Sequence, residues 1–301
     1  MEASQRHTGR SPVPDRLSLF ESVERFVRPG SSVYIGNFGA QLFAVGHEII
    51  RQRIRDLHVI VGSGGILLDE LLGAGVVREM TFSHCWGVVG PSPAWNLRRI
   101  AEGGFQDVET HELTLGLLSA GLTAAAWEVP FMPVPDLSGT GYVEEDWTRG
   151  FLSRAESAFG GSLIVKAIRP DVAFVHVDKG DALGNGVTLA PWGETLLAAN
   201  AARETVVVAE EVVPPEEVRG AGGGSFPGIL ASAVVEEPFG LHPDGAVGRY
   251  DRDVVTYESY ARASSTPEGF DEWLRTWVLD VPDRRRYRAA VEQASRRSER
   301  G

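Results

Sequence analysis

The chain has 301 residues, of which 43% are hydrophobic and 23% are charged. This is enough apolar material to bury a full core in one large domain or two ordinary ones, so the composition indicates a globular protein. Acidic residues outnumber basic ones, 41 against 29, which gives a net charge of −12. Because a phosphate backbone or an anionic membrane surface needs a clustered basic partner, we expect neither nucleic acid nor a membrane to bind here.

Both ends of the chain are polar. The first fifteen residues contain Pro12 and Pro14 and no apolar run of the signal-peptide kind, and no segment approaches the roughly 20 apolar residues that cross a bilayer. We therefore predict a cytoplasmic protein with a flexible tail at 1–15, one domain at 16–287 and a basic polar tail at 288–301. The arginine-rich cluster at 284–300 is interpreted as a solvated, partly frayed helix, not as a binding patch.

The most informative local pattern is the run at 32–41. A short apolar strand ends there in the turn Gly36-Asn37-Phe38-Gly39. Helical spacing predicts one helix before the strand, at 19–27, and a second after the turn, at 42–50. A turn of this kind offers free backbone N–H groups to an anion or a carbonyl oxygen. The same glycines are also explained by sterics alone, and that alternative stays open.

Strand-like and helical segments alternate along most of the chain. Apolar strands are predicted at 57–61, 76–82, 163–168, 172–177 and 205–209, and helices near 69–72, 94–101, 113–127 and 194–202. This alternation predicts an α/β fold with a mainly parallel sheet and helices on both faces. Ligands of such sheets bind at the carboxyl ends of the strands, where the turns at 36–41, 62–65, 83–87 and 178–185 are expected. Two glycine-rich stretches, 135–150 and 214–228, are interpreted as mobile surface loops or partner contacts.

Few residues have the chemistry of a nucleophile or a metal ligand. Cys85 is the single cysteine, so the chain has no intrachain disulfide and no multi-cysteine metal site. His84 is its neighbour, but adjacent side chains do not reliably face each other, and we expect Cys85 to be packed or to line a pocket. His84, His111 and His176 are interior histidines, more often structural than catalytic although able to move a proton. Ligand spacing such as His-x-x-x-His is missing, so we predict no metal site.

Taken in order, several segments resemble the α subunit of the family I coenzyme A transferases, in particular the glutaconate CoA-transferase branch. The resemblance extends from about residue 17 to residue 287, and the order and spacing of its motifs are hard to obtain by chance. The motifs are Gly36-Asn37-Phe38, Asp56-Leu57 followed by Gly62-Ser63-Gly64-Gly65, and the stretches at 124–134, 171–176, 238–243, 270–273 and 277–280.

The resemblance implies a fold of the CoA-transferase and sugar-phosphate-isomerase type and an active site shared with a separately encoded, homologous β subunit. In the family a β-subunit glutamate attacks the acyl-CoA and then carries CoA as an enzyme thioester, without a metal or a permanent cofactor. The α subunit is then expected to form αβ hetero-oligomers and to offer an oxyanion contact from Gly36, Asn37, Phe38 and Gly39. Residues assigned to substrate binding are Gln41, Ser63, Gly64, Gly65, Ser83, His84, Cys85, Trp86, Gly87 and Ser92.

This sequence departs from the family pattern at the turn. The family usually has Gly-Gly-Phe there, whereas Asn37 takes the place of the second glycine and Ala44 stands where a proline is common. Asparagine tolerates positive φ and adds an amide donor to the pocket. The loop with Trp86, Val88 and Val89 is more apolar than a dicarboxylic acid requires. We therefore expect an acyl group that is bulkier or less charged than glutaconate.

Two alternatives to transfer stay open. The family also contains hydrolases that open a steroid-derived ring as a CoA thioester, and their α subunit is expected to carry a glutamate just before a glycine. Here that position is Leu115, before Gly116, and leucine cannot move a proton. Glu112, close to Glu109 and His111, is the possible acid or base that would replace it. The second alternative is a non-catalytic member of the fold.

Overall fold

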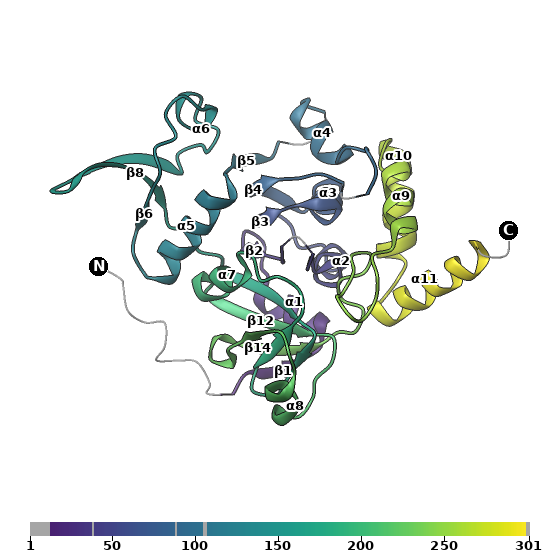
Figure 1. Cartoon of the computed structure of the whole chain (residues 1–301). Coiled ribbons are helices and arrows are strands. Elements are labelled where there is room, and N and C mark those ends of the chain that lie inside the picture. The colour runs from purple at the N-terminus through teal and green to yellow at the C-terminus, as the bar shows by residue number, and fades with distance from the viewer. Residues whose placement is uncertain (1–12, 38, 88, 105–106, 299–301) are drawn as a thin grey trace.

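The computed structural model describes residues 13–37, 39–87, 89–104 and 107–298 (Figure 1). Within these residues an eight-stranded sheet has the order β1-β14-β12-β9-β2-β3-β4-β5, and all of its neighbouring pairs are parallel. The predicted parallel α/β sheet is thereby confirmed. The strands are β1 (Asp15–Leu17), β2 (Ser32–Tyr34), β3 (Leu57–Ser63), β4 (Val77–His84), β5 (Glu109–Glu112), β9 (Val172–Val177), β12 (Glu204–Ala209) and β14 (Ala233–Glu236).

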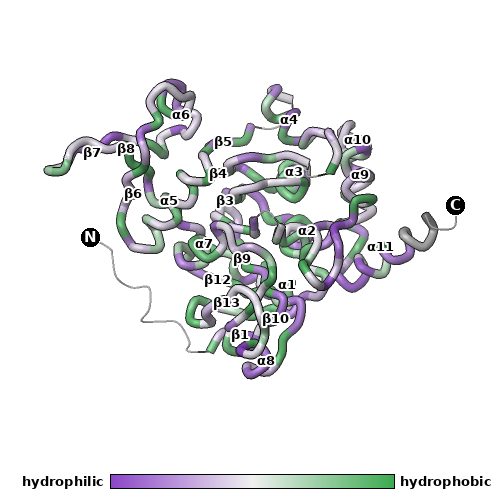
Figure 2. Tube along the Cα trace, viewed as in Figure 1, coloured by the Kyte–Doolittle hydropathy of each residue, from purple (hydrophilic) through white to green (hydrophobic). Residues whose placement is uncertain are grey.

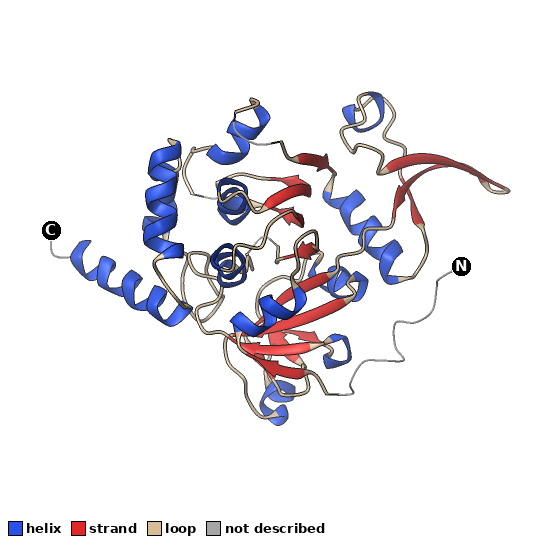
Figure 3. Ribbon diagram, turned by 180° about the vertical axis from the view of Figure 1, so that it is seen from behind, coloured by secondary structure: helices blue, strands red, loops and turns tan. Residues whose placement is uncertain are grey.

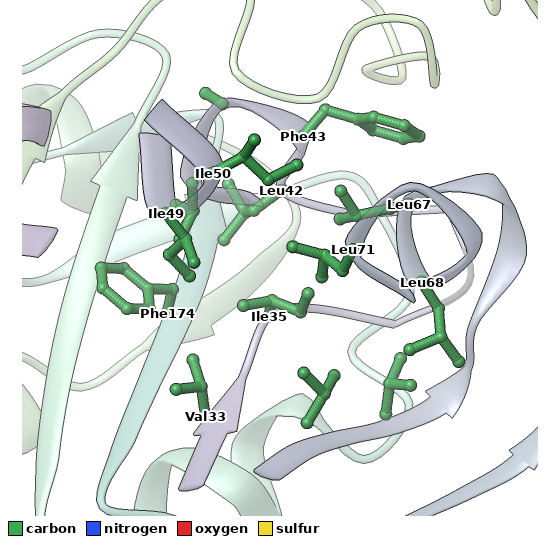
Figure 4. Packing of buried hydrophobic residues seen from close by; sticks show 14 of the residues in the cluster. Val33, Ile35, Leu42, Phe43, Ile49, Ile50, Leu67, Leu68, Leu71 and Phe174 are labelled. Atoms are coloured by element: carbon green, nitrogen blue, oxygen red, sulfur yellow. The ribbon is translucent and has the colours of Figure 1, made fainter. Parts of the chain in front are cut away.

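Helices cover both faces of this sheet, as predicted (Figure 3). Successive strand residues point to opposite faces, so Val33 joins one hydrophobic core and its neighbour Tyr34 joins the other. The first core contains α1 (Leu19–Phe26), α2 (Phe43–Arg51), α3 (Gly65–Gly73), α9 (Val254–Ala263) and α10 (Pro267–Leu274), and the second contains α5 (Leu115–Ala126) and α7 (Thr195–Ala201). Figure 4 shows part of the first core, where Leu42 lies just before α2 and Leu71 belongs to α3.

The strand order reverses direction next to β2. From β2 the chain moves outward through β3, β4 and β5, and later fills the other side through β9, β12 and β14. Strands β2 and β9 therefore lie side by side while the segments that follow them turn to different sides. Open α/β sheets bind their ligands outside the carboxyl ends of the strands at such a switch point. The turn after β2 and the end of β9 meet there.

One predicted strand belongs to a different sheet from the one expected. The segment predicted at 163–168 was expected to be part of the alternating parallel pattern, but β8 (Gly160–Lys166) pairs antiparallel with β6 (Phe131–Val134) and β7 (Leu152–Ser157). The cause is the short link between β7 and β8, because a parallel crossover needs a dozen residues or more. This small sheet projects from the body of the molecule (Figure 1).

The two glycine-rich stretches contain ordered elements. The first holds α6 (Gly141–Glu144), and the second holds α8 (Pro215–Gly220) and β13 (Gly224–Phe226). Strand β13 pairs antiparallel with β11 (Gly186–Thr188), which also pairs with β10 (Lys179–Gly180). A Cβ on Gly223 would lie 2.5 Å from the carbonyl oxygen of Thr188, so the glycine permits close backbone approach. Both stretches therefore carry short regular elements and are not loops throughout, and their role as partner contacts stays a prediction.

The C-terminal basic cluster begins α11 (Arg284–Ser298), and Figure 2 shows this helix as predominantly hydrophilic. Arg284 nevertheless has only 3% of its surface exposed. Its Nε donates to the carbonyl oxygen of Phe239 at 2.8 Å, another guanidinium nitrogen donates to that of His242, and the group lies 4.0 Å from the ring centre of Tyr287. The prediction of a solvated cluster was wrong for Arg284, because the i, i+3 face of the helix is buried. Of the predicted tail at 1–15, residues 1–12 lie outside the described part.

We predict that Arg284→Ala lowers the free energy of unfolding by about 3 kcal/mol, because it leaves two buried carbonyl oxygens without their charged donor. Urea unfolding of the full chain measures this loss. The control is Arg285→Ala on the exposed face of the same helix, which should change stability by less than about 0.5 kcal/mol. Equal losses in the two variants would contradict the structural role of Arg284.

Candidate active site

The turns that follow β2, β3 and β4 are joined by side-chain hydrogen bonds. Nε2 of Gln41 donates to the carbonyl oxygen of Ser63 at 2.7 Å, and the Ser63 hydroxyl lies 2.8 Å from Nε2 of His84. The thiol of Cys85 donates to the carbonyl oxygen of Gly65 at 3.3 Å. The structure therefore brings together these five of the residues that the sequence assigned to substrate binding.

Gly36 shapes the first of these turns. Its φ is +98°, and a Cβ added there would lie 2.2 Å from the carbonyl oxygen of Ala40. Both the conformation and the close approach exclude a side chain, which gives the glycine a steric reason. Gly39 also has a positive φ, +81°, but an added Cβ would meet nothing within 4 Å. Phe38, the fourth predicted member of the turn, lies outside the described residues.

The side chain of Asn37 stabilises the turn. It is buried, and Nδ2 donates to the carbonyl oxygen of Trp192 at 2.7 Å. A Cβ on Gly193 would lie 2.3 Å from the same nitrogen, so the amide is packed tightly on that segment. The sequence suggested an added amide donor in the pocket; in the structure Nδ2 is bonded to the backbone of Trp192. The hydrogen bond from the Asn37 amide therefore attaches the turn to the segment at residues 192 and 193.

A small cavity of about 10 Å³ lies at the switch point and is lined by Gly36, Thr188, Trp192, Thr195 and the buried His176, among others. Nε2 of His176 is 3.4 Å from Oε1 of Glu210. Burial alone would raise the pKa of the Glu210 carboxyl, but the nearby His176 ring and the hydrogen bond from Tyr250 outweigh burial and lower it. His176 is thus held beside a carboxylate at the base of the Gly36 turn.

A much larger cavity of about 990 Å³ opens beside β4, β5 and α4 (Trp95–Ala101). The predicted residues Ser83, His84, Cys85 and Glu112 all line it. Apolar side chains form part of its wall, and acidic ones and an arginine add to it: Met80, Phe82, Leu97, Ile100, Val108, Asp107, Glu145, Asp146, Trp147 and Arg149. The cavity is large enough for a drug-sized ligand.

The other predicted substrate-binding residues lie outside this wall: Gln41, Ser63, Gly64, Gly65, Trp86, Gly87 and Ser92. Trp86 is 55% exposed and contacts the His84 ring edge-on, with ring centres 6.3 Å apart. Gly87 is packed on the backbone of Ser92, whose carbonyl oxygen would be 3.0 Å from an added Cβ. Gly64 is buried against Leu68 and Cys85. Trp86, Gly87 and Gly64 therefore shape the loop more than they line the cavity.

The cysteine and the histidines have partners other than one another. Burial, with a smaller effect of Asp69, raises the pKa of the Cys85 thiol well above its ordinary value, so the thiolate is disfavoured. His84 is bonded to Ser63. Nδ1 of His111 lies 3.2 Å from the carbonyl oxygen of Thr148, and its Nε2 lies 3.2 Å from Glu79. These contacts support the structural interpretation of Cys85 and His111.

Sequence patterns did not single out the segment at 192–195, yet it contacts several turns of the site. Oε1 of Glu194 accepts the N–H of Gly62 at 3.1 Å, and burial raises the pKa of this carboxyl. Leu115, 48% exposed, begins α5 next to it. The only available signal was a glutamate at a predicted helix start after Trp192-Gly193.

Comparison with known proteins identifies the family. The coenzyme A transferase family model matches residues 16–237. The chain is 30% identical to a 3-oxoadipate CoA-transferase subunit from Pseudomonas knackmussii over 92% of this chain and 98% of that protein. It is 28% identical to the cholesterol ring-cleaving hydrolase IpdA subunit of Mycobacterium tuberculosis over 88% of this chain and 94% of that protein. The crystal structure of glutaconate CoA-transferase from Acidaminococcus fermentans superposes with a TM-score of 0.84 at 25% identity, covering 92% of each chain. The chain therefore belongs to the coenzyme A transferase family.

Proposed function

We propose that this chain is the α subunit of a heteromeric acyl-CoA:carboxylic acid CoA-transferase. One observation carries the proposal: the chain matches a CoA-transferase subunit over almost the full length of both proteins. The positions of the two cavities at the carboxyl ends of the strands are in keeping with it.

The proposed reaction begins on a glutamate of the partner subunit. Its carboxylate attacks the thioester carbonyl, the C–S bond breaks, and CoA thiolate leaves as an anhydride forms. The thiolate then attacks the glutamyl carbonyl, which releases the first acid and leaves CoA on the glutamate as a thioester. An acceptor acid reverses these steps. No metal or permanent cofactor takes part in this scheme, and acyl-CoA is the substrate.

The described residues of this chain contribute binding and orientation. In this proposal, backbone N–H groups of the turn that begins at Gly36 stabilise the oxyanion that develops in each attack. The large cavity receives the acyl chain, with Met80, Phe82, Leu97 and Ile100 in its apolar wall. Carboxylates such as Glu112 on the same cavity disfavour a second negative charge on the substrate. We infer a bulky acyl group with little charge.

The assembly follows from the same scheme. Because the nucleophile belongs to the partner, we propose an αβ hetero-oligomer in the cytoplasm, inactive as separate subunits. None of the helices in the described part of the chain combines the length and the apolar character needed to span a bilayer.

We predict that the chain alone turns over no acyl-CoA and that addition of its homologous β subunit gives ping-pong kinetics, because CoA waits on the enzyme between the two acids. Borohydride should trap the CoA adduct on the β subunit. The decisive measurement is acyl-CoA consumption with and without an acceptor acid. Turnover by the purified, isolated α subunit would refute the heteromeric assignment.

Ring-opening hydrolysis is the second candidate, favoured by Glu112, which lines the large cavity, and by the similarity to the IpdA subunit. A hydrolase needs a general base near the thioester chain and no acceptor acid. A non-catalytic member of the family would show neither transfer nor hydrolysis with its partner present.

We predict that Glu112→Gln keeps at least about half of the transfer activity, because Glu112 has no proton to move in transfer and general-base loss would cost ~10²-fold or more. The matched control is Glu145→Gln on the same cavity. Rates are measured with and without acceptor acid. Two results together would favour hydrolysis. The Glu112→Gln complex would stay folded but lose turnover, and free acids would not stimulate the reaction.

We predict that Asn37→Asp lowers kcat by about 10²-fold, in line with the loss of an ordered oxyanion site. Aspartate cannot donate to the carbonyl oxygen of Trp192 and brings a negative charge to the turn. Asn200→Asp is the control, since Asn200 is exposed on α7 and also donates to a carbonyl oxygen, that of Leu196. A change confined to KM would place Asn37 in substrate binding instead.

A further inference from the structure

The segment at 192–195 holds three parts of the site at once. The carbonyl oxygen of Trp192 accepts the Asn37 amide from the turn after β2. Glu194 accepts the N–H of Gly62 at the end of β3. The Thr195 hydroxyl is 2.8 Å from the hydroxyl of Tyr34, which belongs to β2. A displacement of this segment therefore moves the ends of two neighbouring strands together.

Glu194 is wedged at the centre of these contacts. It has 7% of its surface exposed. A Cβ on Gly62 would lie 2.3 Å from Oε1 of Glu194 and 3.0 Å from Cδ2 of Leu115, so the carboxyl fills the space between the end of β3 and the start of α5. Glycine at 62 is the residue that leaves room for it. The contact therefore depends both on glycine at position 62 and on the carboxyl at position 194.

The geometry of this contact needs a long side chain that ends in a hydrogen-bond acceptor. Oε1 of Glu194 accepts the Gly62 N–H at 3.1 Å, and burial raises the pKa of the carboxyl. Glutamine has the same length and keeps an acceptor oxygen. Aspartate lacks the reach, and leucine lacks the acceptor.

We propose that Glu194 is a positioning residue of the transfer reaction, which fixes the end of β3 and the 192–195 segment and thereby holds the Asn37 turn in its working geometry. This inference rests on the proposed function. Glu194 acts through Gly62 and through the segment that carries Trp192, not by contact with the reacting atoms. Its loss should therefore lower kcat and leave KM nearly unchanged.

The test compares the wild-type complex, formed by the full chain with its β subunit, with complexes of three variants, Glu194→Gln, Glu194→Asp and Glu194→Leu. We expect Glu194→Gln to stay within about threefold of the wild-type kcat, and the other two to lose about tenfold or more with KM changed less than about threefold. If Glu194→Gln falls as far as Glu194→Leu, or if Glu194→Leu keeps its kcat, the proposal is overturned.

A control separates positioning from general destabilisation. Thr205→Val removes another buried bond, from the Thr205 hydroxyl near the start of β12 to the carbonyl oxygen of Ala199 near the end of α7. It should lower the melting temperature without lowering kcat. An equal loss of kcat in Thr205→Val would refute positioning by Glu194.

A second measurement stays informative if the wild-type complex transfers no CoA, which would refute the proposed function itself. Hydrogen–deuterium exchange followed by mass spectrometry reports the turns directly. Glu194→Leu should speed exchange in peptides that cover 34–41 and 60–64, and Glu194→Gln should not. Unchanged exchange in Glu194→Leu would overturn the positioning role whatever the activity.

Discussion

The site depends on how the chain reverses after β2. A Cβ at position 36 would lie 2.2 Å from the carbonyl oxygen of Ala40, so the turn is folded directly on its own backbone. Because the turn is so tight, α2 can begin at Phe43. In the first turn of this helix, the N–H of Ala44 donates to the carbonyl oxygen of Gly240 at 3.0 Å. Leu42 and Phe43 enter the first core at once (Figure 4). Core packing and the candidate oxyanion turn are therefore set by one glycine.

Parallel strands that end at one edge leave backbone groups that side chains must satisfy. Gln41, Asn37 and Glu194 do this, each bonded to the backbone of a neighbouring turn. Polar residues that the sequence alone would suggest as catalytic therefore serve mainly to hold neighbouring turns together. Among the described residues, the site then offers a substrate backbone N–H groups and the large cavity. This is in keeping with the proposed reaction, in which the nucleophile comes from a partner.

Local patterns predict the parts of the fold that depend on short-range order. Strands β3, β9 and β12 follow from apolar runs, and the parallel sheet follows from their alternation with helices. Periodicity carries no information on strand direction, so it did not reveal that β8 pairs antiparallel in a second sheet. Arg284 was missed for a related reason. Its acceptors are the carbonyl oxygens of Phe239 and His242, and no local pattern links them to α11.

In the candidate site, too, local sequence patterns predict some features and miss those that depend on long-range contacts. Its turns could be assigned to one edge, because the carboxyl ends of parallel strands meet there. The bond between Asn37 and Trp192 joins residues 155 positions apart, and the bond between Glu194 and Gly62 joins residues 132 positions apart. Both arise because β2 lies beside β9 at the switch point, which is a property of the topology. A single sequence gives no signal for such pairs.

The carboxyls beside the site bear on the choice between transfer and hydrolysis. Hydrolysis needs a base that faces the substrate, and Leu115, exposed at the start of α5, has no proton to exchange. Glu194 lies next to Leu115, but its Oε1 is bonded to the N–H of Gly62 and it is not among the residues that line the large cavity. A carboxyl held in this way does not face a substrate in that cavity. Glu112 faces the large cavity and is the carboxyl on which a hydrolytic mechanism would have to depend. In the transfer reaction proposed above, a glutamate of the partner subunit attacks as a carboxylate, so neither of these groups has to move a proton, and this arrangement favours the proposed transfer.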